Sequence, residues 1–201
     1  CYAPSWVKRG FNSEFELAAN SDGSIPEIMS AFSERNVRAD AKAFASLMKY
    51  IRKADGSEGT VIMVQVENEI GMLGDARDHS KLAQNAYNSP VPYDMMYMLT
   101  SGKANDHIND VWKAAGKATT GSWKEVFGSS LEADEIFMAY WYARYTERVA
   151  AAGKTEYDIP MFVNTALNSR GRKAGEYPSA GPLAHLMPIW KTVAPSIDLI
   201  C

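Results

Sequence analysis

The sequence predicts an α/β fold, because three helical patterns are each followed by a short apolar run of strand length. The three pairs are 33–54 with 60–66, 131–152 with 160–164, and 182–193 with 196–201. Helices between consecutive strands are the usual connection in a parallel sheet, since the chain must return to the same edge before the next strand begins. The alternation therefore predicts parallel strands with crossover helices.

The first helix is predicted over 33–54. Ser33 is a suitable N-cap, because its hydroxyl can accept a hydrogen bond from the first turn, and Asp55 and Gly56 end the pattern. The apolar residues that recur at helical spacing are Val37, Ala41, Phe44, Ala45, Met48 and Ile51.

The run 60–66, Thr-Val-Ile-Met-Val-Gln-Val, is almost continuously apolar and β-branched, which is typical of a buried parallel strand. Earlier in the chain, the turn residues 20–23 lie between two apolar segments and predict a small hairpin over 15–29. Later, 81–128 predicts short helical pieces, since Pro and Gly interrupt it repeatedly.

The second long helix is predicted from Leu131, and Gly153 is expected to end it. Its segment 137–142, Phe-Met-Ala-Tyr-Trp-Tyr, is expected to pack in the core. In the third helix Pro182 suits the first turn, whereas Pro188 is expected to produce a kink.

Three strands and three helices cannot close a barrel, and an open parallel sheet of this size would leave apolar edges exposed. The chain also begins at Cys1, without an initiator Met. We therefore expect 1–201 to be a single domain truncated at both ends, the central third of a larger (β/α) protein.

Composition excludes several classes of function. The chain has 201 residues, 46% of them hydrophobic, and a formal net charge of −3, without a basic run interleaved with aromatics, so a nucleic-acid partner is not expected. No apolar stretch approaches the length of a membrane span. The two cysteines, Cys1 and Cys201, are expected to be ordinary free thiols, and the three histidines are too scattered to predict a metal site.

The segment 61–71, Val-Ile-Met-Val-Gln-Val-Glu-Asn-Glu-Ile-Gly, carries the strongest chemical signal. Strand alternation places Val61, Met63, Gln65, Glu67 and Glu69 on one face, which is apolar in its first half and polar in its second. A strand that crosses a core and emerges at a polar mouth has this pattern, and catalysis in (β/α)8 barrels takes place at that mouth. The alternative is a polar turn that follows a buried strand.

Two carboxyls crowded at a strand end suit acid/base chemistry, since like charges raise the pKa of one of them. The side-chain amide of Asn68 lies between them and can bind a substrate hydroxyl. The residues alone thus predict a carboxylate-based hydrolase.

The motif Gln65-Val66-Glu67-Asn68-Glu69 resembles the acid/base motif of glycoside hydrolase family 35, the β-galactosidases. The likeness extends over nearly the whole chain, to a bacterial branch that acts on β-galactosides, including galactosylated plant polysaccharides. The segments that carry it are 1–8, 65–73, 134–139 and 175–182.

The resemblance implies a retaining exo-β-galactosidase with a (β/α)8 barrel, of which this chain supplies about strands 4 to 6. Glu69 matches the acid/base catalyst and Asn68 the residue that holds the sugar 2-hydroxyl. Glu67 matches a motif position without a chemical step of its own, and we expect it to pack against or orient Glu69. The nucleophile, a Glu after strand 7, lies beyond Cys201, so the chain alone is expected to be inactive. The resemblance implies a carbohydrate partner, no cofactor or metal, and a periplasmic or secreted bacterial location.

Weaker candidates surround the motif. Asn164 ends the second strand and either points to the mouth or caps the next loop. Tyr2 and Trp6 are either an aromatic platform for a sugar or packing residues. Glu176 and Tyr177 either reach a leaving-group sugar or form a surface turn, which is the favoured interpretation.

The loop residues Asp75, Arg77 and Asp78 are expected to be solvated, with a local ion pair. Two alternative functions stay open: another retaining glycosidase of the same barrel clan, such as an endo-glycanase, and a carbohydrate-binding barrel without catalysis.

Overall fold

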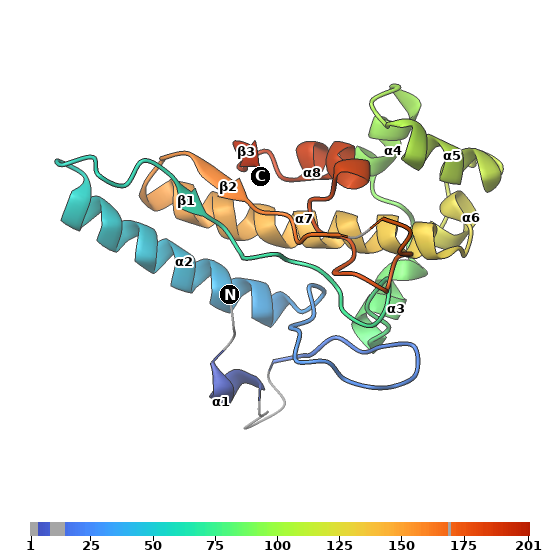
Figure 1. Ribbon diagram of the computed structural model, residues 1–201, viewed down its shortest axis with the longest axis horizontal. Coiled ribbons are helices and arrows are strands. Elements are labelled where there is room, and N and C mark those ends of the chain that lie inside the picture. Colours follow the sequence, from blue (N-terminus) through green and yellow to red (C-terminus); the bar gives the residue numbers. More distant parts are fainter. Residues whose placement is uncertain (1–3, 9–14, 169) are drawn as a thin grey trace.

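The computed structural model describes residues 4–8, 15–168 and 170–201. It is a mixed α/β structure, mostly helical, with a small three-stranded parallel sheet in the order β1-β2-β3 (Figure 1). The strands are β1 (Val64–Gln65), β2 (Met161–Val163) and β3 (Leu199–Ile200). The predicted parallel strands with crossover helices are confirmed, although each strand is shorter than its apolar run.

Helices account for most of the regular secondary structure. They are α1 (Ser5–Lys8), α2 (Glu34–Asp55), α3 (Lys81–Tyr87), α4 (Tyr93–Thr100), α5 (Asp106–Ala114), α6 (Trp123–Phe127), α7 (Leu131–Glu156), the 3-10 turn η1 (Ala184–Leu186) and α8 (Met187–Val193). The first helix begins as predicted, since the Ser33 hydroxyl accepts a hydrogen bond from the Asn36 amide at 3.4 Å. The predicted hairpin contains one antiparallel bridge, between Leu17 and Met29.

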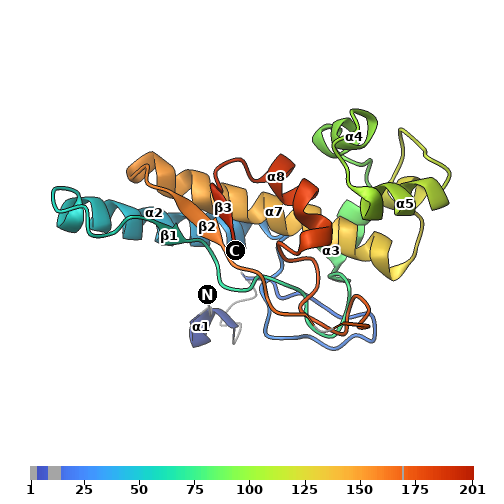
Figure 2. The same ribbon diagram turned by 45° about the horizontal axis from the view of Figure 1, so that its top comes forward.

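The long helices α2 and α7 pack side by side on one side of the sheet (Figure 1, Figure 2). Met161 and Val163 of β2 are buried, as is Val66 just after β1. On the sheet face away from the helices, Met63 is 40% exposed and Leu199 is 48% exposed. The sheet is therefore covered by helices on one face, and apolar side chains are exposed on the other.

One predicted helix end is wrong. The helix α7 does not end at Gly153 but continues through it to Glu156. Gly153 lies where α7 meets α2, and an added Cβ would collide with the Phe44 ring, so close helix contact rather than termination explains this glycine. The helix predicted over 182–193 is interrupted just before Pro188, where the 3-10 turn η1 ends and α8 begins at Met187. Pro188 therefore lies in the first turn of α8, where proline is tolerated because no helical hydrogen bond is lost.

The predicted solvated loop is also wrong. The Asp78 side chain is fully buried and accepts hydrogen bonds from the Ser30 hydroxyl at 2.6 Å and the Ser80 amide at 2.7 Å. Arg77 is buried as well, and its guanidinium pairs with Asp134 at 2.9 Å. Buried charges need such partners, so this loop is a polar part of the core.

The segment 137–142 packs in the core as predicted. Phe137 and Tyr140 are fully buried, and their rings surround the buried indole of Trp123 at centroid distances of 5.2 and 5.4 Å. Among the described residues, no helix is long and apolar enough to cross a membrane.

At the contact between α2 and α7, we expect an alanine in place of a helical glycine to destabilise the protein. Gly153→Ala should destabilise the protein by about 1–3 kcal/mol through overpacking against Phe44, although alanine normally stabilises a helix interior. Urea denaturation of the two proteins measures the difference. The control is Gly153→Ala combined with Phe44→Ala: in that background the alanine should cost less. Stabilisation by Gly153→Ala alone would show that the contact is not tight.

Candidate functional site

A network of side-chain amides joins the ends of β1 and β2. The Gln65 amide nitrogen lies 3.0 Å from Asn68 Oδ1, 3.1 Å from Asn164 Oδ1 and 2.8 Å from the Glu67 carbonyl oxygen. Asn164 Oδ1 also accepts the backbone N–H of Glu69 at 2.8 Å, and Asn164 Nδ2 donates to Asn68 Oδ1 at 3.3 Å. The structure thus brings together Asn68, Glu69 and Asn164.

The backbone of this segment is bent in a way that the alternation of a strand does not predict. Glu67 has φ of 58° and Glu69 has φ of 48°, both in the left-handed region. Residues with a Cβ adopt that region at a cost of roughly 1–2 kcal/mol each, so the surrounding contacts must hold them there. The chain therefore turns sharply just after β1, within the polar motif.

The side chain of Glu67 is paired with the helical layer. Its carboxyl shares a hydrogen bond with Asp40 of α2, and the hydroxyl of Tyr145 on α7 donates to Asp40 at 2.9 Å. Burial, reinforced by the negative charge of Asp40, raises the pKa of Glu67 to about 8. A carboxyl pair does crowd at the strand end, but the partner that raises the pKa of Glu67 is Asp40.

The carboxylate of Glu69, in contrast, is exposed to solvent. Its backbone is fixed by Asn164, while its side chain extends from the carboxyl end of β1. An exposed carboxyl on a fixed backbone can exchange protons with water and with a bound ligand. The two glutamates of the motif therefore have different environments.

Two loops lie beside the motif, the segment 70–80 that follows it and the loop 164–183 that follows β2, and they are packed tightly against each other. Met72 and Ser179 form an antiparallel bridge with hydrogen bonds of 2.8 and 2.9 Å. An added Cβ on Gly71 would lie 2.9 Å from the carbonyl carbon of Pro178, and one on Gly181 would collide with the Ile70 carbonyl oxygen. Both glycines are needed because backbone meets backbone at these positions.

A buried carboxylate on α7 anchors the second of these loops. Glu135 is 1% exposed and lies 3.0 Å from the Tyr177 hydroxyl, 3.1 Å from the Ala180 amide and 3.0 Å from His185 Nε2. Burial raises the pKa of Tyr177, with the Glu135 charge as the second cause. The favoured surface-turn interpretation is thus wrong for Tyr177, which is buried.

Sequence analysis missed the grouping of Glu135, Tyr177 and His185. The ring of His107 contacts His185 edge-on at 4.8 Å, and burial lowers the pKa of His107. One feature of the sequence could have indicated this group: the acidic residue Glu135 directly precedes the apolar run Ile136–Tyr140 of a core helix. An acid at such a position needs buried hydrogen-bond donors.

The other predicted candidates lie apart from the network. Tyr2 is outside the described residues, and so is the side chain of Trp6, whose backbone belongs to α1. Glu176 is exposed, and its carboxylate accepts a hydrogen bond from the Lys173 amide at 2.9 Å. Cys201 is exposed and carries a free thiol.

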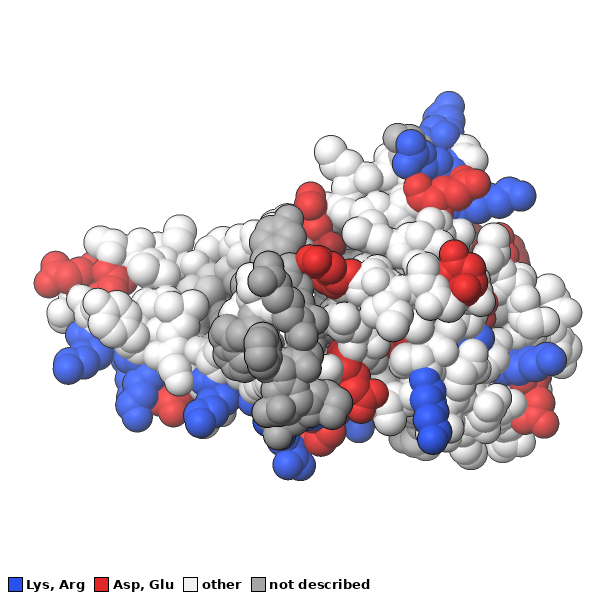
Figure 3. All heavy atoms as spheres, turned by 90° about the horizontal axis from the view of Figure 1, so that it is seen from below, with Lys and Arg blue, Asp and Glu red and all other residues white. Residues whose placement is uncertain are grey.

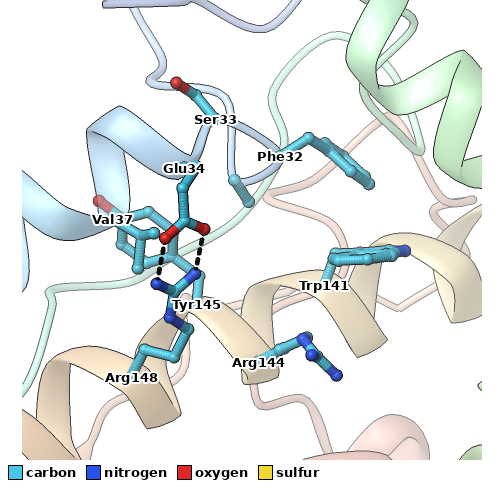
Figure 4. Close-up of a pocket in the computed structure, with 9 residues that line it drawn as sticks. Phe32, Ser33, Glu34, Val37, Trp141, Arg144, Tyr145 and Arg148 are labelled. Carbon is cyan, nitrogen blue, oxygen red and sulfur yellow. Dashed lines mark hydrogen bonds and ion pairs between the residues drawn. The ribbon is translucent and has the colours of Figure 1, made fainter.

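A cavity of about 160 Å³ lies elsewhere, between the start of α2 and the middle of α7 (Figure 4). Two polar residues in its wall are already paired, since Arg148 holds the Glu34 carboxylate with two contacts of 2.6 Å. Hydrogen bonds from Arg148, followed by those from Arg38, lower the pKa of Glu34 to about 2. None of the predicted site residues lines this cavity.

No protein-family model and no curated protein matches the chain. Within the described ranges, no group of three or more His, Cys, Asp or Glu side chains is arranged to hold a metal ion. The geometry at the ends of β1 and β2 is therefore the main basis for a functional proposal.

The Glu67 environment makes the stability of the protein depend on pH. Its pKa is raised from 4.5 to about 8 on folding, so this group contributes most below pH 4.5, and its contribution is lost as the pH rises through 8. Glu67→Gln, which stays neutral, should remove that part of the decline. Urea unfolding at about pH 5 and pH 9 measures the effect. The control is Glu58→Gln at an exposed position, which should lose as much stability between the two pH values as wild type. An equal loss of stability in wild type and Glu67→Gln would contradict the role of Glu67.

Proposed function

We propose that this chain is the central part of a (β/α)8 barrel in a retaining exo-β-galactosidase, with Glu69 as the general acid/base. The observation that carries the proposal is the hydrogen bond from the Glu69 N–H to Asn164, at 2.8 Å. It places an exposed carboxyl at the carboxyl end of β1, beside the end of the neighbouring strand. In (β/α)8 barrels catalytic residues come from these strand ends.

The topology supports a barrel. Consecutive strands are neighbours and parallel, with Gln65, Phe162 and Leu199 at matching positions in the register. The long helices α2 and α7 lie on one face only (Figure 2), whereas a doubly wound sheet carries helices on both faces. In the proposed barrel, the face with exposed Met63 and Leu199 is the interior, and β1, β2 and β3 are strands 4, 5 and 6.

In the proposed mechanism Glu69 protonates the glycosidic oxygen while a second carboxylate, outside this chain, attacks the anomeric carbon. The bond to the leaving group breaks and a covalent galactosyl-enzyme forms. Glu69, now ionised, removes a proton from water, which attacks the anomeric carbon and releases galactose and the nucleophile. The two carboxyls work at a separation of roughly 5–5.5 Å in retaining enzymes.

Asn68 is suited to bind a sugar hydroxyl because of how its amide is held. Its Oδ1 accepts hydrogen bonds from Gln65 at 3.0 Å and from Asn164 at 3.3 Å. With the oxygen occupied as an acceptor, the Nδ2 group is left to donate to a ligand. The network thereby fixes the orientation of the amide, and we assign it to the 2-hydroxyl of the galactosyl ring.

Glu69→Gln in the complete barrel protein tests the acid/base role. Substrates with poor leaving groups need protonation, so their hydrolysis should fall by roughly 10²–10⁴-fold. Activated aryl β-galactosides should lose less in the first step, and azide should restore turnover by replacing the water that Glu69 activates. Steady-state rates with and without azide measure both effects.

Glu58→Gln, which removes an exposed carboxyl before the start of β1, is the matched control and should retain activity. Wild-type hydrolysis of an unactivated disaccharide by Glu69→Gln would refute the assignment. A panel of aryl β-glycosides separates the alternatives: turnover of galactosides alone supports the proposal, turnover of other glycosides favours another glycosidase of the clan, and sugar binding without turnover favours a binding barrel.

Asn68→Ala should lower kcat/KM on a normal galactoside by about 100-fold, since the contact to the 2-hydroxyl strengthens in the transition state. A 2-deoxygalactoside already lacks that contact, so its kcat/KM should fall much less. Comparison of the two substrates with both proteins measures the difference. Equal relative losses would mean that Asn68 acts only by supporting the structure.

A further inference from the structure

The loop that follows β2 carries three basic side chains within four positions, Arg170, Arg172 and Lys173. All three are exposed. Figure 3 shows Lys and Arg side chains projecting together at the upper right of that view, next to acidic ones. The chain as a whole has a formal net charge of −3, so the local excess of positive charge in this loop is opposite in sign to the net charge of the chain.

The hydrogen bonds of this loop leave its positive charges available. The Glu176 carboxylate accepts the backbone N–H of Lys173, and the Arg172 guanidinium donates to the Glu176 carbonyl oxygen, both at 2.9 Å. Within the part of the chain that the structure describes, no ion pair joins Arg170, Arg172 or Lys173 to a carboxylate. The loop is therefore shaped by its own contacts, and its three cations are exposed. Lys173 is close enough to Glu132 to contribute to the lowering of the pKa of that carboxyl, after backbone and Ser130 hydrogen bonds.

One end of the loop is fixed beside the proposed acid/base residue, and the other end is bridged to the segment that follows it. It begins after Asn164, whose side chain holds the Glu69 N–H, and it ends at Ser179, which is bridged to Met72. Between these points, an added Cβ on Gly175 would lie 3.3 Å from the backbone of Asp75, so the loop also rests on the segment that follows β1. The cations consequently lie on the side of the sheet where the strands end.

We propose that this basic loop binds a sugar carboxylate on the leaving-group side of the substrate, so that the preferred substrate is a β-galactoside of a uronic acid. The inference rests on the proposed function and adds the chemical class of the leaving group to it. A terminal galactosyl residue is neutral and has no group for three cations to pair with. A uronate in the adjoining position has a carboxylate, and guanidinium groups bind carboxylates through paired hydrogen bonds.

The test compares two substrates that differ in one charge, a β-galactosyl-uronic acid disaccharide and its methyl ester. The complete protein should hydrolyse the acid with a kcat/KM about tenfold higher than the ester at low salt, because exposed charge pairs are individually weak. The ratio should fall towards one in about 0.5 M NaCl. In the triple variant Arg170→Gln, Arg172→Gln, Lys173→Gln the ratio should be close to one at every salt concentration.

A second triple variant, Lys42→Gln, Lys49→Gln, Lys53→Gln, is the matched control. It removes the same charge from exposed positions on α2, a helix that runs towards the start of β1 rather than its end, and should keep the tenfold ratio. A ratio of one in wild type, or a ratio that survives the loop variant, would overturn the inference.

The proposed function is tested separately by a neutral aryl β-galactoside. The α2 control variant should hydrolyse it at the wild-type rate, and measurable turnover by the loop variant shows that this variant folds. If the wild-type protein hydrolyses no β-galactoside at all, the proposed function fails. If it hydrolyses the neutral substrate without distinguishing acid from ester, only the present inference fails.

Discussion

The hydrogen bond between the Glu69 N–H and the side chain of Asn164 connects two strand ends that are 95 residues apart in sequence. It depends on the parallel register of β1 and β2, in which Gln65 is opposite Phe162, so that the residues after each strand emerge side by side. The bond is exposed to solvent, and its contribution of roughly 0.5–1 kcal/mol is at most comparable to the cost of one left-handed residue. The bend of the motif and its cross-strand contact are therefore energetically linked.

A second layer of contacts keeps the loops around the motif in place. Glu135 would be costly to bury alone, and the donors Tyr177, Ala180 and His185 offset that cost. Because these three belong to the loop after β2 and the turn that follows it, α7 holds that loop against the segment after β1. A site supported by a long helix in this way is more precisely positioned than one supported by loops alone.

The sequence predicted those features that depend on local pattern. The helix starting after Ser33, the strand runs and their parallel connection all follow from periodicity and end signals within short windows. Features that depend on distant partners were missed: Gly153 resembled a helix stop, because nothing nearby indicated Phe44, and Arg77 and Asp78 resembled a solvated loop. Polar residues can be placed in a core only when their partners are known.

The same distinction applies within the motif itself. Its residue types indicated acid/base chemistry, and Asn164 was a candidate because it follows a neighbouring strand. What alternation could not give was the direction of each side chain, since regular strand geometry ends at Gln65 and a left-handed residue follows at Glu67. The bend separates two carboxyls that look equivalent in the sequence: Glu67 is tied to Asp40, where a proton is retained, and Glu69 is left exposed. A short motif can thus hold one carboxyl in a buried pair and leave the other exposed, provided that the backbone between them turns.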